Sequence, residues 1–128
     1  DLARSAEYVS AAREDVAVLS GDDITALPMW SVGGAGVVSV AGNICPRHMV
    51  AMWRAFRDGR QEEALRMHGR LLPLFRALFL ESNPTPIKYL MAKQGLTSTY
   101  ELRLPLVPVS ADTAAQLDHC YDALEFDQ

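Results

Sequence analysis

Lysine is scarce in this chain of 128 residues, where Lys88 and Lys93 are the only two. The other basic side chains are arginines scattered along the sequence, and the formal net charge is −4. Nucleic-acid binding draws on clustered Lys and Arg, so this distribution argues against a nucleic-acid partner. A Schiff-base lysine has to be desolvated and aimed into a pocket, whereas a lysine near the start of a helix, such as Lys88, is more often solvent-facing.

Cysteines and long apolar runs are also rare. Cys45 and Cys120 lie far apart without CxxC or Cys/His spacing, which indicates neither a metal site nor a disulfide framework and suits a reducing cytoplasm. The most apolar stretch, 32–40, is interrupted by glycines and is shorter than the roughly 18 to 20 residues of a membrane span. We therefore expect a cytoplasmic protein with no membrane segment.

Motifs for nucleotides and metals are missing too. The glycine-rich stretch 33–36 precedes a predicted strand, and no Gly-x-Gly-x-x-Gly opens a helix, which argues against nucleotide binding. The three histidines, His48, His68 and His119, fall on separate predicted helices with no His-x3-His pair, so surface or boundary positions are expected for them. The sequence predicts no cofactor and no metal.

Hydrophobic patterning predicts an α/β chain. The apolar runs 16–19 and 37–41 are short and lack polar alternation, which is typical of parallel strands covered on both faces. A helix over 24–32 between them completes a βαβ unit. Further helices are expected over 2–12, 46–58, 61–80 and 84–94 and after Ser110. Their local signals are N-caps at Asn83 and Ser110, a left-handed C′ position at Gly59 and a kink at Pro73. Residues 102–106 are expected to form an extended packing segment.

The helices carry apolar side chains at helical spacing, which predicts a core and not a cofactor site. The inward side chains are expected to include Trp53, Phe56, Leu71, Phe75, Leu78, Phe79, Ala114, Leu117, Tyr121 and Leu124. The predicted organisation is a βα region over residues 1–59 followed by an all-helical domain over residues 60–128.

The segment Ser20-Gly21-Asp22-Asp23 follows the first predicted strand. In parallel α/β folds, catalytic and binding groups gather at the carboxyl ends of strands, which makes this segment a candidate site. The same residues also suit a helix N-cap with a carboxylate that compensates the helix dipole. Taken by themselves, the residues favour the N-cap interpretation.

Four blocks, in order and with similar spacing, resemble the dihydrodipicolinate synthase family. They are Val-Leu-Ser-Gly-Asp-Asp at 18–23, Gly-Gly-Ala-Gly-Val-Val-Ser-Val-Ala-Gly-Asn at 33–43, Glu-Ser-Asn-Pro-Thr-Pro-Ile-Lys at 81–88 and Leu-Arg-Leu-Pro at 102–105. The resemblance covers nearly the whole chain, from Asp1 to about Leu124.

The resemblance implies the C-terminal part of a (β/α)8 TIM barrel, with 16–19 as strand seven and 37–41 as strand eight, followed by a helical domain. It implies a lyase of lysine and diaminopimelate biosynthesis, in which a lysine upstream of this segment forms a Schiff base with pyruvate and the enamine attacks aspartate semialdehyde. Gly21 and Asp22 match positions near the aldehyde, and Val38 matches a position whose backbone carbonyl faces the catalytic lysine. A homotetramer is implied for the complete enzyme, and inactivity for the isolated segment.

Other interpretations stay open. Related pyruvate-dependent aldolases such as N-acetylneuraminate lyase share the barrel and the Schiff base. Two further interpretations are a non-catalytic helical interaction module and an engineered half-barrel. Both agree with the row of inward apolar side chains on every helix and with the absence of a Schiff-base lysine from this segment. The size in solution separates them, because a lone half-barrel exposes sheet edges and is expected to associate, whereas a true module stays monomeric.

Overall fold

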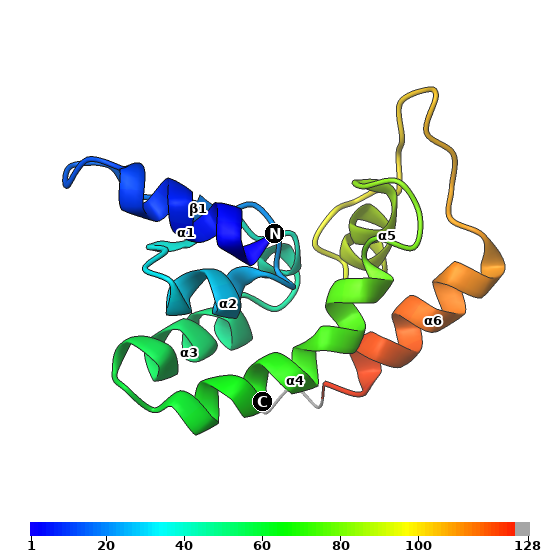
Figure 1. The fold of residues 1–128 in the computed structure, drawn as a ribbon. Helices are drawn as coiled ribbons and strands as arrows, with labels where there is room; N and C mark the ends of the chain where they lie inside the picture. Colours follow the sequence, from blue (N-terminus) through cyan, green and yellow to red (C-terminus); the bar gives the residue numbers. More distant parts are fainter. Residues whose placement is uncertain (125–128) are drawn as a thin grey trace.

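A computed structural model describes residues 1–124 as a mostly helical chain, with a very small sheet near α1 and α2 and with α5 and α6 at the far end (Figure 1). The last four residues of the predicted helical domain, 125–128, lie outside the described residues. In chain order the elements are α1 (Leu2–Ala11), β1 (Leu19–Ser20), α2 (Ala26–Ser31), β2 (Gly36–Val37), the 3₁₀ helix η1 (Ala41–Asn43), α3 (Pro46–Arg57), α4 (Gln61–Ala77), α5 (Thr85–Lys93) and α6 (Ala111–Asp122). Among residues 1–124, no helix has both the length and the hydropathy to cross a membrane.

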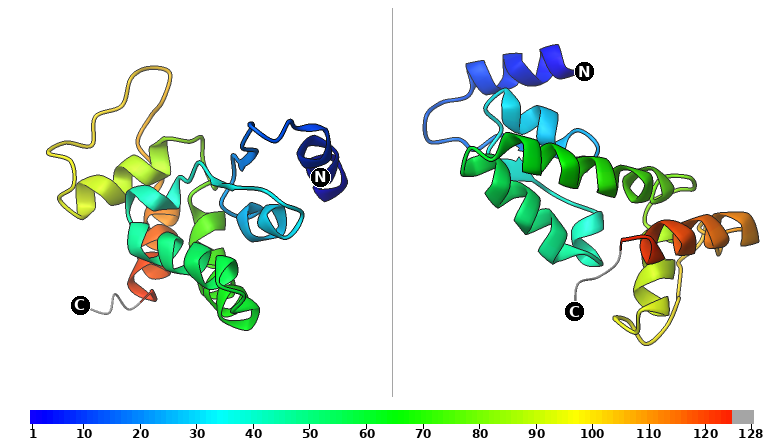
Figure 2. Two further views of the ribbon diagram at one scale, coloured as in Figure 1. Left: turned by 90° about the vertical axis from the view of Figure 1, so that its left-hand side faces the viewer. Right: turned by 90° about the horizontal axis from the view of Figure 1, so that it is seen from below.

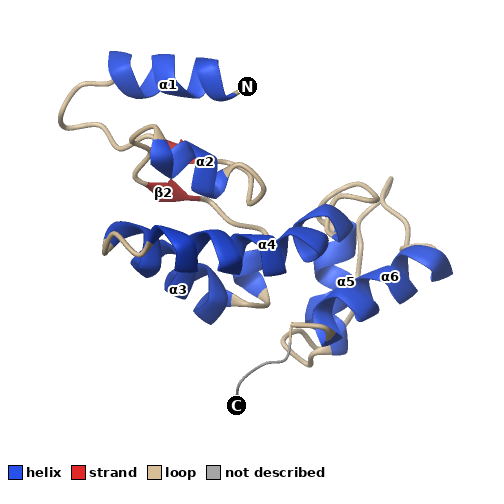
Figure 3. Cartoon of the chain, turned by 60° about the horizontal axis from the view of Figure 1, so that its bottom comes forward, coloured by secondary structure: helices blue, strands red, loops and turns tan. Residues whose placement is uncertain are grey.

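The two strands pair in parallel through the crossover helix α2, as the apolar runs predicted. Ser20 lies opposite Val37 in the register. The backbone N–H of Ala35 donates to the Val18 carbonyl, and that of Val38 donates to the Ser20 carbonyl, both at 2.8 Å, so the ladder continues past each end of the strands. In Figure 3 this short ladder lies between α2 and the pair α3 and α4. The predicted βαβ unit is confirmed.

The predicted extent and burial of the strands are wrong. Each strand has two residues, and Ala41, the expected end of the second, starts η1 instead. The side chains of Leu19 and Val38 are 47% and 66% exposed. A continuously apolar strand is typical of a sheet covered on both faces, whereas residues 1–124 cover these two side chains only in part. The two strands therefore carry more apolar side-chain surface than residues 1–124 bury.

Residues of α2, η1 and α3 to α6 form a single hydrophobic core. Figure 2 shows the paths of these helices from two further sides. Its largest fully buried apolar side chains are Phe75, Met52, Leu71, Leu74, Leu78, Leu90 and Leu117. The helices α3 and α4 lie side by side, and Trp30 of α2 packs edge-on against Trp53 of α3 with ring centroids 4.8 Å apart. The core thus includes residues from both sides of position 59, where the sequence predicted a domain boundary.

Helix ends mostly follow the sequence signals. Gly59 has φ +79, the left-handed conformation expected after α3, and the Ser110 hydroxyl accepts the Thr113 N–H at 3.2 Å as an N-cap. The prediction that Asn83 caps α5 is wrong. The Thr85 N–H instead donates to the Ser82 carbonyl at 2.9 Å, which closes a turn before the helix, and Thr85 becomes the first helical residue.

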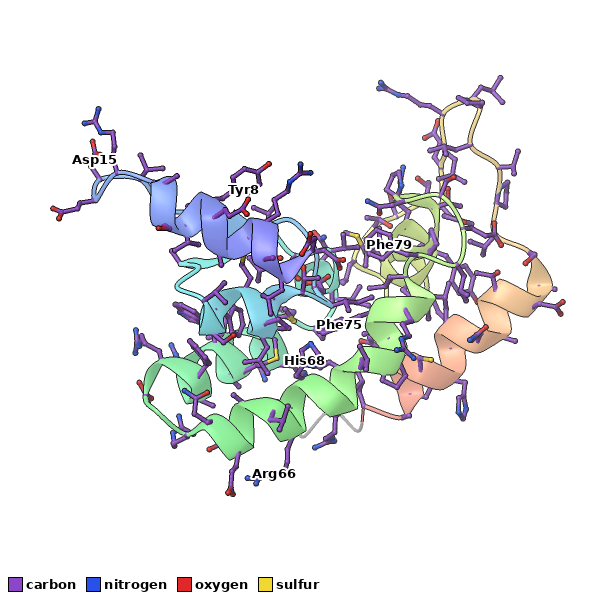
Figure 4. All side chains as sticks on the ribbon, viewed as in Figure 1. Tyr8, Asp15, Arg66, His68, Phe75 and Phe79 are labelled. Carbon is purple, nitrogen blue, oxygen red and sulfur yellow. The ribbon has the colours of Figure 1, made fainter. Side chains whose placement is uncertain are left out.

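One expected core position and one residue of the predicted packing segment are exposed. Phe79 is 45% exposed because α4 ends at Ala77 and not near residue 80, so the helical spacing that predicted its burial no longer applies. Figure 4 shows Phe79 beyond the end of α4 and Phe75 on the helix itself. Leu104 is 89% exposed, since a turn closed by the Leu106 N–H on the Arg103 carbonyl replaces the predicted extended packing segment.

Candidate functional site

The carboxyl ends of β1 and β2 bring Gly21, Asp22 and Val38 to one place in the fold. The Val38 N–H donates to the carbonyl of Ser20, the residue directly before Gly21, at 2.8 Å. No atom outside its chain neighbours lies within 4 Å of the position that a Cβ on Gly21 would take, so Gly21 faces open space. These are the three residues that the family resemblance singled out, and residues 17 positions apart in the sequence become neighbours through the parallel register.

Asp22 is held by a local network of polar groups. Its Oδ1 atom accepts the backbone N–H of Ile24 at 3.0 Å. The Ser20 hydroxyl donates to the Asp22 carbonyl at 2.8 Å and lies 3.0 Å from the Thr25 hydroxyl. The N-cap interpretation of this segment is therefore partly correct, because the carboxylate binds a backbone amide ahead of α2, although the residue at the N-cap position of α2 is Thr25.

Asp23 behaves differently from its neighbour, a difference that the sequence did not indicate. Its side chain is fully buried, and its Oδ2 atom accepts the backbone N–H groups of Val40 and Ala41 at 3.0 and 2.9 Å. The path of the second strand decides whether Asp22 or Asp23 points inward. The hydrophobic periodicity of the sequence does not predict this choice. Asp23 is the residue of this region that sequence reasoning missed.

The helix α4 also reaches the strand ends. Nε2 of His68 lies 3.0 Å from the backbone carbonyl of Ile24, and the His68 ring packs edge-on against Phe75 at 5.9 Å. Figure 4 shows His68 and Phe75 close together on α4, while Arg66 extends away from them. The expected boundary position of His68 is confirmed, and the residue adds a contact between α4 and the loop that follows β1.

Within residues 1–124, the strand ends hold backbone groups, hydroxyls and carboxylates, and neither lysine side chain contacts them. Lys88 lies on α5, partly exposed, and its Nζ donates to the backbone carbonyl of Glu101. Lys93 pairs with Asp118 at 2.6 Å, and this hydrogen bond raises the Lys93 pKa. No group of three His, Cys, Asp or Glu side chains among the described residues is arranged to hold a metal ion. Among the described residues, both lysines therefore lie on α5 and are engaged with Glu101 and with Asp118 of α6, and not at the strand ends.

An apolar hollow of about 310 Å³ lies beside β2. It is lined by Trp30, Ala35, Gly36, Val37, Ser39, Gly42, Pro46, Met49, Val50 and Trp53. The indole N–H of Trp30 is buried and finds no acceptor among the described residues. The second strand has β1 as its neighbour on one edge, and no other strand of the described part pairs with it.

The sequence profile of the dihydrodipicolinate synthetase family matches residues 1–124. The chain belongs to this family. It is 44% identical over 117 residues to the 4-hydroxy-tetrahydrodipicolinate synthase of Sulfurihydrogenibium sp., a match that covers 91% of this chain and 40% of the relative. The chain therefore spans about 40% of the length of this curated relative.

Solved structures of the dihydrodipicolinate synthetase family show the same arrangement of elements. The synthase of Methylacidiphilum fumariolicum SolV matches with a TM-score of 0.91 and 41% identity, covering 96% of this chain and 41% of that chain. The dihydrodipicolinate synthase of Acinetobacter baumannii, solved in complex with pyruvate, matches with a TM-score of 0.87 and 31% identity, covering 96% and 42%. The α/β fold and the family resemblance seen in the sequence are both confirmed.

Proposed function

We propose that this chain is the C-terminal portion of a Schiff-base-forming synthase that condenses pyruvate with aspartate semialdehyde in lysine and diaminopimelate biosynthesis. In this proposal β1 and β2 are strands seven and eight of a (β/α)8 barrel, with residues 60–128 as the helical domain. The amine of a lysine outside this chain condenses with the ketone of pyruvate with loss of water, and the imine loses a methyl proton to give an enamine. The enamine carbon attacks the aldehyde carbon, whose oxygen takes up a proton, and hydrolysis of the imine frees the lysine. Gly21 and Asp22 position the aldehyde, and the Val38 carbonyl faces the lysine.

The observation that carries this proposal is the meeting of Gly21, Asp22 and Val38 at the carboxyl ends of two parallel strands. In barrels of this kind, active sites lie at that face and take residues from several strands. Open space next to Gly21 leaves room for a substrate, and the part-exposed Asp22 is already oriented by Ile24. The pyruvate complex of the Acinetobacter baumannii relative supports pyruvate as one substrate.

Barrel closure explains the apolar surface that the described residues leave uncovered. Leu19 and Val38 are about half exposed or more, and the hollow beside β2 is apolar with an unpaired indole N–H at Trp30. A further strand on the free edge of β2 supplies carbonyl groups and covers this surface, as full closure does for sheet edges. We propose that the part of the barrel absent from this chain fills that place.

The test uses a hybrid synthase, in which this chain replaces the segment of the Sulfurihydrogenibium synthase that it matches. We expect borohydride to trap a pyruvate adduct on the hybrid, and we expect turnover with aspartate semialdehyde but not with N-acetylmannosamine. Mass spectrometry locates the adduct on a lysine outside this chain. An adduct on Lys88 or Lys93 overturns the proposed register, and a folded hybrid without any adduct overturns the function.

A glycine pair tests the substrate-facing role of Gly21. A Cβ on Gly21 and a Cβ on Gly69 of α4 both enter open space in the described structure. We expect Gly21→Ala to lower kcat/KM for the aldehyde at least tenfold, because its Cβ enters the substrate volume, while pyruvate trapping falls less. Gly69→Ala, at an exposed position on α4, is expected to leave kcat/KM unchanged. Equal activity of the two variants contradicts the assignment of Gly21.

We also propose a cytoplasmic location and a homotetramer for the complete enzyme. The location is supported by two buried cysteines, Cys45 and Cys120, neither of which forms a disulfide. Light scattering of the hybrid synthase measures the assembly state. A monomer under assay concentrations contradicts the tetramer without affecting the proposed chemistry.

A further inference from the structure

The Asp23 carboxylate connects the ends of the two strands through one oxygen atom. Oδ2 accepts the N–H of Val40 at 3.0 Å and that of Ala41 at 2.9 Å, residues 17 and 18 positions further along the chain. Hydrogen bonds from backbone amides to a carboxylate are among the stronger ones in proteins. The segment that follows β2 is thus tied to the residue that follows Asp22.

These bonds fix the backbone around Val38. On one side of Val38, its own N–H is bound to the Ser20 carbonyl at 2.8 Å. On the other side, two residues later, Val40 is bound to Asp23. The peptide group that carries the Val38 carbonyl therefore lies between two fixed points, both anchored in the Ser20 to Asp23 segment. We expect the direction of that carbonyl to be less well defined when either point is lost.

The surroundings of Asp23 exclude direct contact with a substrate. The side chain is fully buried, whereas Asp22 beside it is partly exposed. Cys45, which donates from Sγ to the Ala41 carbonyl at 3.3 Å, is buried next to this clamp. Burial and, to a smaller extent, the negative charge of Asp23 raise the pKa of the Cys45 thiol to about 12. Asp23 acts from inside the protein.

We propose that Asp23 is a positioning residue, which sets the Val38 carbonyl relative to Gly21 and Asp22 by clamping the backbone of Val40 and Ala41. The inference rests on the proposed function, because it gives the Val38 carbonyl a role beside the Schiff-base lysine. The clamp requires one acceptor oxygen, and the negative charge only strengthens its two hydrogen bonds. An asparagine at position 23 keeps such an oxygen, and an alanine does not.

The experiment compares Asp23→Asn and Asp23→Ala in the hybrid synthase. We expect Asp23→Ala to lower kcat for condensation by about 10- to 100-fold, since a misplacement of about 1 Å in a reacting geometry has that effect. Its KM for pyruvate is expected to change less. Asp23→Asn is expected to keep kcat within about threefold. The matched control, Asp112→Ala, removes an exposed carboxylate on the first turn of α6 and is expected to change neither.

Amide hydrogen exchange gives a readout that does not depend on activity. The Val40 and Ala41 amides are expected to be protected in the parent hybrid and in Asp23→Asn, and to exchange at least tenfold faster in Asp23→Ala. If Asp23→Ala is insoluble, Asp23→Ser replaces it, because the shorter hydroxyl side chain does not reach both amides.

The outcomes separate the two proposals. An active parent hybrid whose folded Asp23→Ala variant keeps its kcat overturns the positioning role while the proposed function stands. Loss of kcat in Asp23→Asn equal to that in Asp23→Ala also overturns it, because charge is then required. A folded parent hybrid that forms no pyruvate adduct overturns the proposed function, and the inference with it.

Discussion

Nε2 of His68 lies 3.0 Å from the backbone carbonyl oxygen of Ile24 and joins α4 to the loop that follows β1. The Ile24 N–H is bound to Oδ1 of Asp22 at 3.0 Å, so both backbone polar groups of Ile24 have partners. A helix 44 residues later in the sequence thus restrains the loop that presents Asp22. The helical region takes part in shaping the candidate site.

Replacement of His68 tests this restraint. His68→Leu leaves the partly buried Ile24 carbonyl without its partner, and we expect the free energy of unfolding of the hybrid synthase to fall by about 1–3 kcal/mol. His119→Leu, at an exposed position on α6, is expected to change it by less than about 0.5 kcal/mol. Urea denaturation measures both, and equal effects of the two variants count against the contact.

The core prediction concerns two leucines of α4. Leu74 is fully buried, whereas Leu65 on the same helix is 64% exposed. Leu74→Ala leaves a cavity in the core, and we expect it to lower the free energy of unfolding by about 2–5 kcal/mol. Leu65→Ala makes the same chemical change at the surface, where we expect an effect of less than about 0.5 kcal/mol. Similar losses at both positions are incompatible with the packing described for α4.

Glu81 provides a prediction about acid stability. The backbone N–H of Ser110 donates to its Oε1 at 3.0 Å, and this bond, helped by the Thr113 and Ser110 hydroxyls, lowers the Glu81 pKa below its ordinary value of 4.5. A lowered folded-state pKa stabilises the protein above pH 4.5, and the contribution is lost as the pH falls through the folded value.

We therefore expect Glu81→Gln to flatten the loss of stability of the hybrid synthase between pH about 5 and 3. The melting temperature across this range is the measurement. The control is Glu62→Gln, because the Glu62 side chain is 97% exposed. A pH profile of Glu81→Gln that is as steep as that of the parent excludes this role for Glu81.

The reactivity of the Cys45 thiol tests whether the buried region next to Asp23 stays closed in the folded protein. Cys45 is 2% exposed, and burial raises its pKa to about 12. The thiolate is the reactive form, so Ellman's reagent at pH 8 is expected to label Cys45 in the folded hybrid only after unfolding. The Cys45→Ala variant shows which part of the labelling comes from Cys45. Rapid labelling of the native protein that is lost in Cys45→Ala would contradict the burial of this thiol.

Local signals explain which features could be predicted from the sequence. Gly59 and Ser110 mark helix ends through backbone freedom and a side-chain oxygen, and the structure places both as expected. The spacing that put Phe75 in the core failed at Phe79, because the helix had already ended at Ala77. Periodicity predicts which residues share a face and gives little information on where a helix stops.

In the candidate site, too, the sequence predicted the residues with local signals and missed the contacts between distant segments. The resemblance in the strand-end blocks pointed to Gly21, Asp22 and Val38, and the parallel register brings them together. The inward turn of Asp23 and the contact of His68 with Ile24 involve partners 17 and 44 residues away. Such contacts exist only once the chain is folded, so a pattern within one segment does not reveal them.

The continuous core across residue 59 has a consequence for how the protein opens. Because α3 and α4 share one apolar interior with α2 and α6, the helices on the two sides of Gly59 are expected to unfold as one cooperative unit. By contrast, α1 buries no side chain completely and is expected to open on its own at lower free energy. The hierarchy of stability along the chain is then expected to follow shared burial, so that the proposed helical domain after Gly59 opens together with α3.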